Sequence, residues 1–477
     1  MTTSSLRVSS SERSQVVMLV NNPCVTDSRV IKSAEALVQG GWQVTVLCRF
    51  GAGLPEREKL NGVTYRRLKP PPTKISDRTA WRKRKDPVIP LRTLVVPVQS
   101  KAIKSNGQSG TFLALLTAKG TKISLRLIAT PKRVIVKLFR KLKPYVAYPL
   151  KVLYWFNENN EFERISLPVL KQMKVDIIHC HDLTTLPTGV ALAKQTKCKL
   201  VYDSHELEMH RNAQYTARVW RKRRKLETIG IKRADAVITV SDSIADYLAQ
   251  DYGVAKPHVV LNSPDLRDTG EALRTVRKDL NLSASVPLAV YVGSVTINRG
   301  LENVVRSLSS YPDLRFATVG PVRAQTRLEL EALADSCDVS DRIFFLPAVE
   351  PNAVVPYLAD ADVSVLAIQN VCLSYYYCMP NKLLESVFAG VPVVVANLHE
   401  LKKFVNTYSC GLVMDETSPS SIADTIKKVI ANRESFRLTS EARADLAHNF
   451  GWPAQARKLE DIYRSLKESG PRAAVLP

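Results

Sequence analysis

The residues with the clearest chemical potential lie between Pro380 and Glu385. Pro380, Asn381 and Lys382 begin an amphipathic helical pattern, and Glu385 follows nearly one turn later. The free N–H groups and positive dipole end of a helix N-terminus favour a diphosphate, and Lys382 would add a full charge. Glu385 would accept hydrogen bonds from ribose hydroxyls. Taken singly, Lys382 also fits a solvated surface lysine, and Glu385 a first-turn acid that interacts with the helix dipole.

A second motif supplies another cation. An apolar run over residues 288–294 reads as a strand ending at Gly293, and Arg299 and Gly300 then begin a helix. Ligands of doubly wound sheets bind at the carboxyl ends of the strands, where this loop lies. A guanidinium can hold two phosphate oxygens at once. Arg299 and Lys382 together therefore predict a site for the diphosphate of a nucleotide.

Polar side chains also end strands in the first half of the chain. His181 and Asp182 end one predicted strand, and His205 follows the next. We expect them to face a cleft, although capping of local backbone is the favoured explanation for His181. Asp27 precedes the first helical pattern and fits an N-cap.

No metal site is predicted. The His-Cys-His-Asp run at 179–182 lies on one strand end, where alternate side chains point in opposite directions. Asp360 and Asp362 imitate an acidic metal-binding pair, but they directly precede an apolar strand. We interpret them as a helix-to-strand connection.

The elements that position these residues predict two α/β domains. At 477 residues the chain is too long for one ordinary core. Short apolar strands alternate with helical patterns, which is typical of parallel, doubly wound sheets. We expect a first domain over 15–265, a second over 280–450, and a C-terminal helix over 451–467 that packs back across the join.

A basic segment interrupts the first domain. Between Pro87 and Asn157 there are Lys and Arg residues but no Asp or Glu, and the cluster WRKRK precedes this stretch at 81–85. We predict an insertion at about 70–157, whose residues 81–156 bind an anionic membrane surface, because cations alternate there with apolar and aromatic side chains. A solvated basic face is the alternative. Nucleic acid is disfavoured because no familiar nucleic-acid-binding signature accompanies the charge.

Bulk properties agree with a globular protein that meets an anionic partner. The formal net charge is +23, whereas hydrophobic residues make up 45% of the chain. The cysteines are scattered without a CxxC pair, and no apolar run is long enough for a spanning helix. We expect a cytoplasmic protein, peripheral on the inner face of the cell membrane.

Six segments in this order resemble the retaining glycosyltransferases of family 4. They are DSRVIKSAEAL, DIIHCHDLTTLP, LVYDSHEL, ADAVITVSDSIADYL, VGSVTINRGLE and PNKLLESVFAGVPVV. The resemblance covers about residues 15–466 except the basic insertion. It implies a GT-B fold, in which two Rossmann-like domains face each other across a cleft, and metal-independent transfer of a sugar with retention.

The resemblance also implies individual roles. Arg299 falls where the family has a phosphate-binding cation, and Glu385 falls on the second glutamate of its paired-glutamate motif. The first glutamate is replaced by Tyr377, and the basic residue that often follows Gly293 is replaced by Ser294. His205 resembles the histidine that points toward the transferred sugar.

The expected function is transfer of a sugar from a nucleotide-diphosphate donor to an acceptor hydroxyl. His205, Arg299 and Lys382 are the candidate catalytic residues. Gly293, Asn381 and Glu385 complete the donor site, and the acceptor side contains Asp27, His181 and Asp182. A hexosyl or N-acetylhexosaminyl group, a lipid-linked glycan or surface polysaccharide product, and no metal or other cofactor are expected. The alternatives are a sugar-nucleotide epimerase and a non-catalytic relative.

Overall fold

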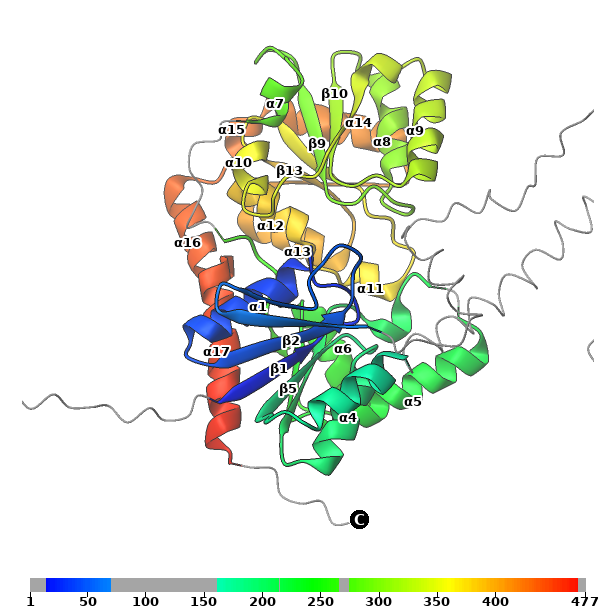
Figure 1. The fold of residues 1–477 in the computed structure, drawn as a ribbon. Coiled ribbons are helices and arrows are strands. Elements are labelled where there is room, and N and C mark those ends of the chain that lie inside the picture. Colours follow the sequence, from blue (N-terminus) through cyan, green and yellow to red (C-terminus); the bar gives the residue numbers. More distant parts are fainter. Residues whose placement is uncertain (1–13, 70–160, 214, 266–273, 471–477) are drawn as a thin grey trace, which may run out of the picture. The chain divides into compact units, whose positions relative to one another are not determined.

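The computed structural model describes residues 14–69, 161–213, 215–265 and 274–470. The chain divides into two units, and the described residues belong almost entirely to the unit formed by Met1–Pro71 and Phe162–Pro477. The predicted basic insertion at about 70–157 lies outside the described residues. Figure 1 shows two α/β layered regions within this unit.

The first region is built on an eight-stranded sheet of order β3-β4-β2-β1-β5-β6-β7-β8. All neighbouring strands are parallel except β3 and β4. The strands are β1 Gln15–Leu19, β2 Gln43–Arg49, β3 Arg57–Leu60, β4 Val63–Leu68, β5 Ile177–His181, β6 Lys199–Ser204, β7 Ala236–Thr239 and β8 His258–Val259. The helices are α1 Ser28–Gln39, α4 Leu186–Gln195, η1 Glu208–His210, α5 Ala217–Arg233 and α6 Asp242–Tyr252.

The second region is built on a six-stranded parallel sheet of order β11-β10-β9-β12-β13-β14. Its strands are β9 Leu288–Val292, β10 Arg315–Val319, β11 Ile343–Leu346, β12 Val363–Leu366, β13 Val393–Ala396 and β14 Gly411–Met414. Its helices are α7 Val276–Asp279, α8 Leu301–Ser307, η2 Leu308–Ser310, α9 Ala324–Ser336, η3 Ser340–Arg342, α10 Val354–Leu358, α11 Leu373–Tyr376, α12 Asn381–Phe388, α13 His399–Tyr408, α14 Pro419–Ala431, α15 Arg433–Phe436 and α16 Ser440–Phe450.

The central strands are apolar because both of their faces are covered. Every residue of β5, β9, β12 and β13 is buried. Helix α1 shows the complementary pattern, since it buries one apolar stripe and begins at Asp27, whose carboxylate accepts from the backbone N–H of Val30. The predicted N-cap role of Asp27 is confirmed, and so are the two doubly wound α/β domains.

The antiparallel hairpin β3–β4 was not expected. The sequence of β3, REKL, is mostly charged and carries no apolar alternation, because this strand lies at the exposed edge of the sheet. The sequence feature that indicates this hairpin is its turn, Asn61-Gly62. Both residues have positive φ, at 49° and 83°, as a two-residue hairpin turn requires. The short strand β14 was also missed.

The last helix, α17 (Trp452–Glu468), follows the second sheet in sequence but packs on the first region. Leu459, Ile462, Tyr463 and Leu466 join the same apolar cluster as β1 and α1. The rings of Tyr463 and Trp42 meet edge to face at 5.5 Å between centroids. The first core is therefore completed by residues from the opposite end of the chain.

None of the helices within the described ranges is both long and apolar enough to cross a membrane.

Candidate functional site

The candidate residues follow strands near the point where the strand order of each sheet reverses. The first sheet has this switch point between β1 and β5, and the second has it between β9 and β12. Ligands of open α/β sheets bind outside the carboxyl ends of strands at such points. Asp27 comes after β1 and His181 ends β5, whereas Gly293 follows β9 and the start of α12 comes after β12. The topology therefore brings the predicted residues to the ligand-binding edge of their sheets.

The N-terminus of α12 presents backbone donors and a lysine. Pro380 is the N-cap residue and supplies no capping side chain, so Asn381 and Lys382 begin a turn whose N–H groups lack a side-chain cap. The ammonium group of Lys382 donates to Tyr291 Oη at 3.2 Å. A Cβ atom on Gly293 would lie 3.4 Å from Lys382 Nζ, so the glycine keeps space open beside the lysine. This arrangement suits an anionic group.

Arg299 adds a second cation to this space. Its guanidinium lies 5.2 Å from the centroid of the Tyr375 ring, and its buried Nε has no hydrogen-bond partner within the part of the chain that the structure describes. Burial raises the pKa of the Cys378 thiol to about 12, while Lys382 and Arg299 both act to lower it. Both cations therefore act on the same thiol. A buried donor without an acceptor costs about 1–3 kcal/mol, and a phosphate oxygen would remove this cost.

Glu385 lies one turn along α12 and is half-buried. Burial raises the pKa of its carboxyl, while Lys382 and Lys32 lower it. Burial lowers the pKa of Lys32 to about 8, and Glu385 acts in the opposite direction. The Lys32 ammonium also donates to the carbonyl of Ser263 at 2.5 Å. Glu385 is thus a carboxylate surrounded by cations.

Tyr377 occupies the position of the missing first motif acid. It directly follows α11, and its ring meets that of His399 edge to face at 5.7 Å between centroids. Its backbone carbonyl accepts from Ser241 Oγ at 2.7 Å. Aromatic packing therefore replaces a charge at this position.

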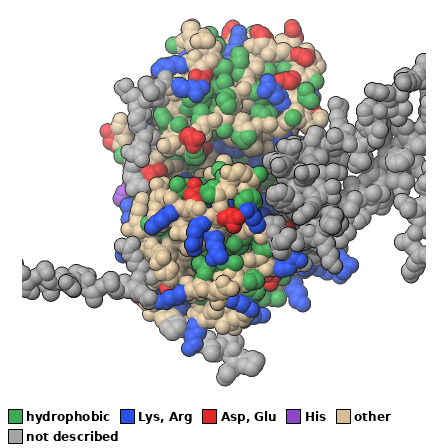
Figure 2. Space-filling view, viewed as in Figure 1, with side chains coloured by type: hydrophobic (Ala, Val, Ile, Leu, Met, Phe, Trp, Pro, Cys, Tyr) green, Lys and Arg blue, Asp and Glu red, His purple; other side chains and the backbone are tan. Residues whose placement is uncertain are grey.

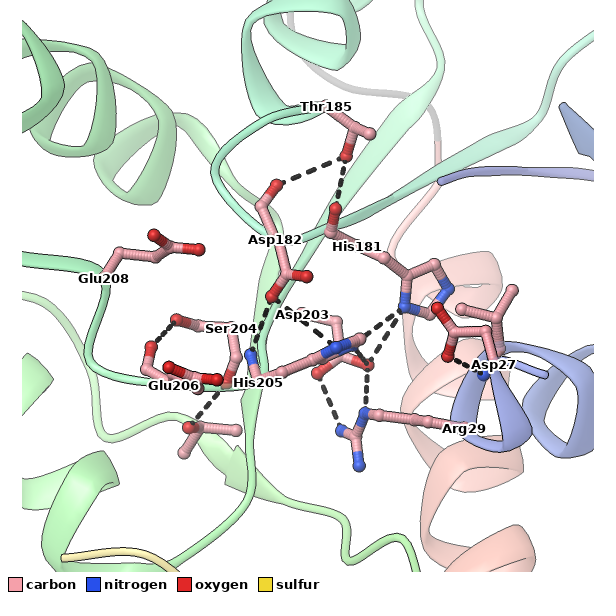
Figure 3. Close-up of polar contacts among 12 residues, drawn as sticks. Asp27, Arg29, His181, Asp182, Thr185, Asp203, Ser204, His205, Glu206 and Glu208 are labelled. Atoms are coloured by element: carbon pink, nitrogen blue, oxygen red, sulfur yellow. Dashed lines mark hydrogen bonds and ion pairs between the residues drawn. The ribbon is translucent and has the colours of Figure 1, made fainter. Parts of the chain in front are cut away.

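In the first region, Asp203 is the centre of a buried polar group (Figure 3). Arg29 donates to both carboxylate oxygens, at 2.9 Å from Nε and 2.7 Å from Nη2, and its Nη1 donates to the carbonyl of Val260 at 2.7 Å. Burial alone would raise the pKa of Asp203, but Arg29 and His205 hold it well below its usual range. Asp203 is therefore an anion fixed by Arg29.

His205 lies between two carboxylates. Its Nε2 is 3.5 Å from Asp203 Oδ2 and its Nδ1 is 3.5 Å from Asp182 Oδ1. Burial acts to lower the pKa of His205, but Asp182 and Asp203 outweigh it and raise the pKa to about 9. Asp182 has a φ of 61°, a conformation that is uncommon outside glycine, and its carboxylate also accepts from the backbone N–H of His205 at 3.4 Å. At neutral pH, His205 is thus a cation that donates.

His181 does not cap local backbone, contrary to the favoured explanation. Its Nδ1 lies 3.1 Å from His205 Nε2 and 3.5 Å from Asp203 Oδ2. His181 is fully buried, and burial lowers its pKa to about 3, so it stays neutral. The more exposed position therefore belongs to His205, whose side chain is 19% exposed, while the buried His181 contacts its ring.

The interpretation of the His-Cys-His-Asp run was incomplete. Alternation does turn Cys180 into a different apolar cluster, but His179 and His181 share a face, and β6 adds Asp203. Ligand atoms of these three residues lie within 4.8 Å of one another. Arg29 already engages both oxygens of Asp203, however, and a divalent ion there would lie beside its guanidinium.

The acidic pair at 360–362 has a structural role. Asp362 is buried and binds Arg277 at 2.9 Å and Arg433 at 2.7 Å. It also accepts from the backbone N–H of Leu288 at 2.8 Å. The pair joins α10 to β12, as interpreted from the sequence.

Sequence reasoning missed three members of the first-region group. Arg29 and Asp203 are 174 positions apart and were given no role, although both lie in segments that carry the resemblance and a charged residue in an otherwise apolar strand such as KLVYDS is a signal. Tyr463 Oη lies 2.7 Å from Nδ1 of the buried His179, and nothing in the sequence announced this contact. A cavity of about 490 Å³ next to α6, α16 and α17 contains none of the candidate residues.

Family models match both regions. The model described as Glycosyltransferase Family 4 matches residues 146–267, and the model described as Glycosyl transferases group 1 matches residues 274–449. A D-inositol 3-phosphate glycosyltransferase from Xylanimonas cellulosilytica is 26% identical over 312 residues, which cover 62% of this chain and 73% of the relative. An uncharacterized glycosyltransferase from Methanocaldococcus jannaschii is 24% identical over 313 residues, covering 64% of this chain and 78% of the relative.

Solved structures share the fold. Sucrose-phosphate synthase from Thermosynechococcus elongatus superposes with a TM-score of 0.69 at 18% identity, covering 96% of this chain and all of that one. The Anabaena protein HepE in complex with UDP-glucose gives a TM-score of 0.60 at 13% identity, covering 94% of this chain and 99% of that one. Together with the two α/β sheets, these matches show that the chain belongs to the family 4 glycosyltransferases with a GT-B fold.

Proposed function

We propose that the protein transfers a hexosyl or N-acetylhexosaminyl group from a nucleotide-diphosphate donor to an acceptor hydroxyl with retention of anomeric configuration. The observation that carries this proposal is the pair of cations at the switch point of the second sheet. Lys382 and Arg299 both act on the Cys378 thiol, Gly293 leaves room beside Lys382, and the buried Nε of Arg299 has no hydrogen-bond partner among the described residues. A diphosphate supplies the charge and the acceptor oxygens that this space lacks.

The proposed donor site uses each group for a separate task. The N–H groups at Asn381 and the Lys382 ammonium hold one phosphate, and Arg299 holds the other. Glu385 accepts from the ribose; burial raises the pKa of its carboxyl, and the neighbouring Lys382 and Lys32 act against that rise. Tyr377 packs where an acid would contact the sugar ring, which makes donor-sugar selection depend on shape and backbone groups.

Transfer then breaks the bond between the anomeric carbon and the diphosphate oxygen, and the bonding electrons leave with the diphosphate. The acceptor oxygen forms the new bond on the same face, and its proton passes to the departing phosphate oxygen. Arg299 and Lys382 stabilise the growing negative charge. His205 is protonated at neutral pH because Asp182 and Asp203 raise its pKa, so it orients hydroxyl groups as a donor and does not act as a base.

The acceptor side is proposed to contain Asp27, His181 and Asp182, with His181 acting through His205. We further propose metal-independent chemistry. Within the described ranges, one cluster resembles a metal site, and its carboxylate, Asp203, already binds Arg29. A lipid-linked glycan or surface polysaccharide precursor at the inner membrane face remains the proposed acceptor class. Residues 81–156, on which the membrane contact was predicted, lie outside the described residues.

A nucleotide-sugar screen tests the proposal directly. Purified protein is heated with UDP-, GDP-, TDP- and ADP-sugars, and slow hydrolysis of each donor is followed in parallel. One donor class should raise the melting temperature, since a ligand that binds only the folded state stabilises it by mass action. The shift should disappear in Lys382→Ala and persist in Lys402→Ala, which changes an exposed lysine of α13.

The alternatives have their own signatures in this screen. An epimerase would convert the donor to an isomer without any acceptor, and product analysis would detect it. Nucleotide binding without hydrolysis, and without transfer to any candidate acceptor, would favour a non-catalytic relative. No binding by any of the donors would refute the proposed donor site.

A further inference from the structure

The segment between β12 and α12 offers no carboxylate to a bound sugar. Residues 363–384 contain no Asp or Glu, and Tyr377 occupies the position of the first motif acid. A sugar ring carries several hydroxyl groups, and a carboxylate is the strongest side-chain acceptor for them because it is charged. Shape and backbone groups at Tyr377 do not replace such an acceptor. A carboxylate that contacts the transferred sugar must therefore come from another element.

The loop that follows β6 lies against this donor-side segment. The backbone N–H of Leu207 donates to Ser374 Oγ at 3.2 Å, and both residues are buried. Tyr375 directly follows Ser374, and its ring centroid lies 5.2 Å from the guanidinium of Arg299. Glu206 directly precedes Leu207. The contact therefore holds an acid of the first region next to the segment on which a proposed phosphate-binding cation packs.

Glu206 is fixed in place but stays accessible. Its backbone carbonyl accepts from Ser204 Oγ at 2.8 Å (Figure 3). Arg211 Nε lies 2.8 Å from Glu206 Oε2, and the side chain of Glu206 remains 41% exposed. An ionised carboxylate can accept about four hydrogen bonds. The pairing with Arg211 therefore orients the carboxylate and leaves acceptor capacity for hydroxyl groups of a ligand.

The charge of Glu206 acts on the donor-side segment. Burial raises the pKa of the Cys378 thiol to about 12; Lys382 and Arg299 act against that rise. Glu206 adds to the rise at the same thiol. Burial also raises the pKa of Cys372, and Glu206 again acts in the same direction. These two thiols flank α11 and the replaced motif position, so the acid lies within electrostatic reach of the segment that lacks one.

We propose that Glu206 supplies the sugar-contacting carboxylate that the donor-side motif lacks. Its carboxylate oxygens accept hydrogen bonds from hydroxyl groups of the transferred sugar, and Arg211 is the positioning residue that holds them. The first region therefore helps to select the donor sugar as well as to receive the acceptor. This assignment rests on the proposed function, because it presupposes a nucleotide-sugar donor.

The chemistry of the contact sets a preference among sugars. A site built to hydrogen-bond a hydroxyl group discriminates strongly against the analogue that lacks it, because the polar group of the protein is then left unpaired. Glu206 is an acceptor, whereas the adjacent His205 is a cation that donates. Donor sugars that keep the contacted hydroxyl group are thus selected over their deoxy analogues.

Calorimetry with paired ligands tests the contact in the full chain. The donor that raises the melting temperature in the nucleotide-sugar screen is titrated beside its own nucleoside diphosphate. Glu206→Gln should bind the nucleotide-sugar about 10-fold more weakly than the wild type, because a neutral amide is a weaker acceptor than a carboxylate. It should bind the bare diphosphate as the wild type does. Glutamine preserves the size of this half-exposed side chain, so the fold should persist.

A matched acid on another surface provides the control. Glu331 of α9 is also 41% exposed, and it pairs with Arg327 at 2.7 Å. Figure 2 shows acidic and basic side chains interspersed where Figure 1 draws α8 and α9, as on an ordinary charged surface. Glu331→Gln should leave both Kd values unchanged. Equal Kd values of Glu206→Gln and Glu331→Gln for the nucleotide-sugar would overturn the proposal.

Deoxy analogues of the donor sugar identify the contacted hydroxyl group. The analogue that lacks it should bind the wild type about 10-fold more weakly and should lose nothing further in Glu206→Gln, because the two changes remove the same hydrogen bond. Additive losses for every analogue would contradict a direct contact.

The bare diphosphate separates this proposal from the proposed function. If the wild type binds none of the four nucleoside diphosphates, the donor site fails, and the role of Glu206 fails with it. If the wild type binds one of them but Glu206→Gln weakens the diphosphate and the nucleotide-sugar equally, the donor site stands and the sugar contact of Glu206 is refuted.

Discussion

Removing the Lys382 side chain is the sharpest test of the donor site. The ammonium has one described protein acceptor, Tyr291 Oη at 3.2 Å, and Tyr291 itself donates to the carbonyl of Ser294 at 3.0 Å. Because Tyr291 keeps that second bond, Lys382→Ala should leave no buried group unpaired and should barely change stability. A charged hydrogen bond to phosphate contributes about 1.5–3 kcal/mol. We expect the Kd for the matching nucleoside diphosphate to rise by about 10- to 150-fold.

Isothermal titration calorimetry at constant ionic strength measures this change. Arg299→Ala should weaken binding by a similar factor, and the double variant should lose less than the sum of the two free energies, since both cations act on one diphosphate. Lys402→Ala serves as the control. Unchanged Kd values in both single variants, with the fold intact by circular dichroism, would refute the assignment of these cations to phosphate.

Three further predictions concern the group around Asp203. Asp203→Asn leaves the buried Arg29 without its counter-charge, which should cost about 3–5 kcal/mol of stability and lower the melting temperature by roughly 10 °C. The control Asp242→Asn changes an exposed carboxylate and should alter the melting temperature little. Equal melting temperatures of the two variants would contradict the pairing of Arg29 with Asp203. The pKa of His205 is raised from 6.5 to about 9, so its stabilising contribution is complete below pH 6.5 and is lost as pH rises through 9. Between these pH values the melting temperature of the wild type should fall more steeply than that of His205→Gln. Parallel profiles of the two proteins would argue against the raised pKa. Because Arg29 already holds Asp203, transfer measured after prolonged treatment with EDTA should proceed at the untreated rate, and inactivation that Zn²⁺ restores would show that the histidines bind a metal after all.

The sequence predicted the positions of site residues correctly where a residue directly follows a recognisable strand. Gly293 and Arg299 lie in the loop after β9, and Lys382 begins the helix after β12, so the switch-point rule could place all three at the carboxyl ends of neighbouring strands. Apolar runs also located the buried central strands, since a strand covered on both faces has few other compositions.

Contacts between distant segments could not be predicted in the same way. Nothing in the local pattern of α1 indicated that Arg29 would meet Asp203, because the pairing depends on how β6 and α1 are registered across the sheet. The expectation for His181 failed for a related reason. Its neighbour in the sequence is the partly exposed Asp182, but in space it stacks on the buried His179 and lies beside the buried Asp203.

The packing of α17 has a consequence for how the protein is made. Leu459, Ile462 and Tyr463 complete the apolar cluster of β1 and α1, and Tyr463 is the hydroxyl partner of His179. During synthesis, the first sheet leaves the ribosome hundreds of residues before these side chains exist. The apolar side chains of β1 and α1 that α17 covers therefore stay exposed to chaperones and to incorrect contacts until α17 has been synthesised. The first region is translated first and completed last.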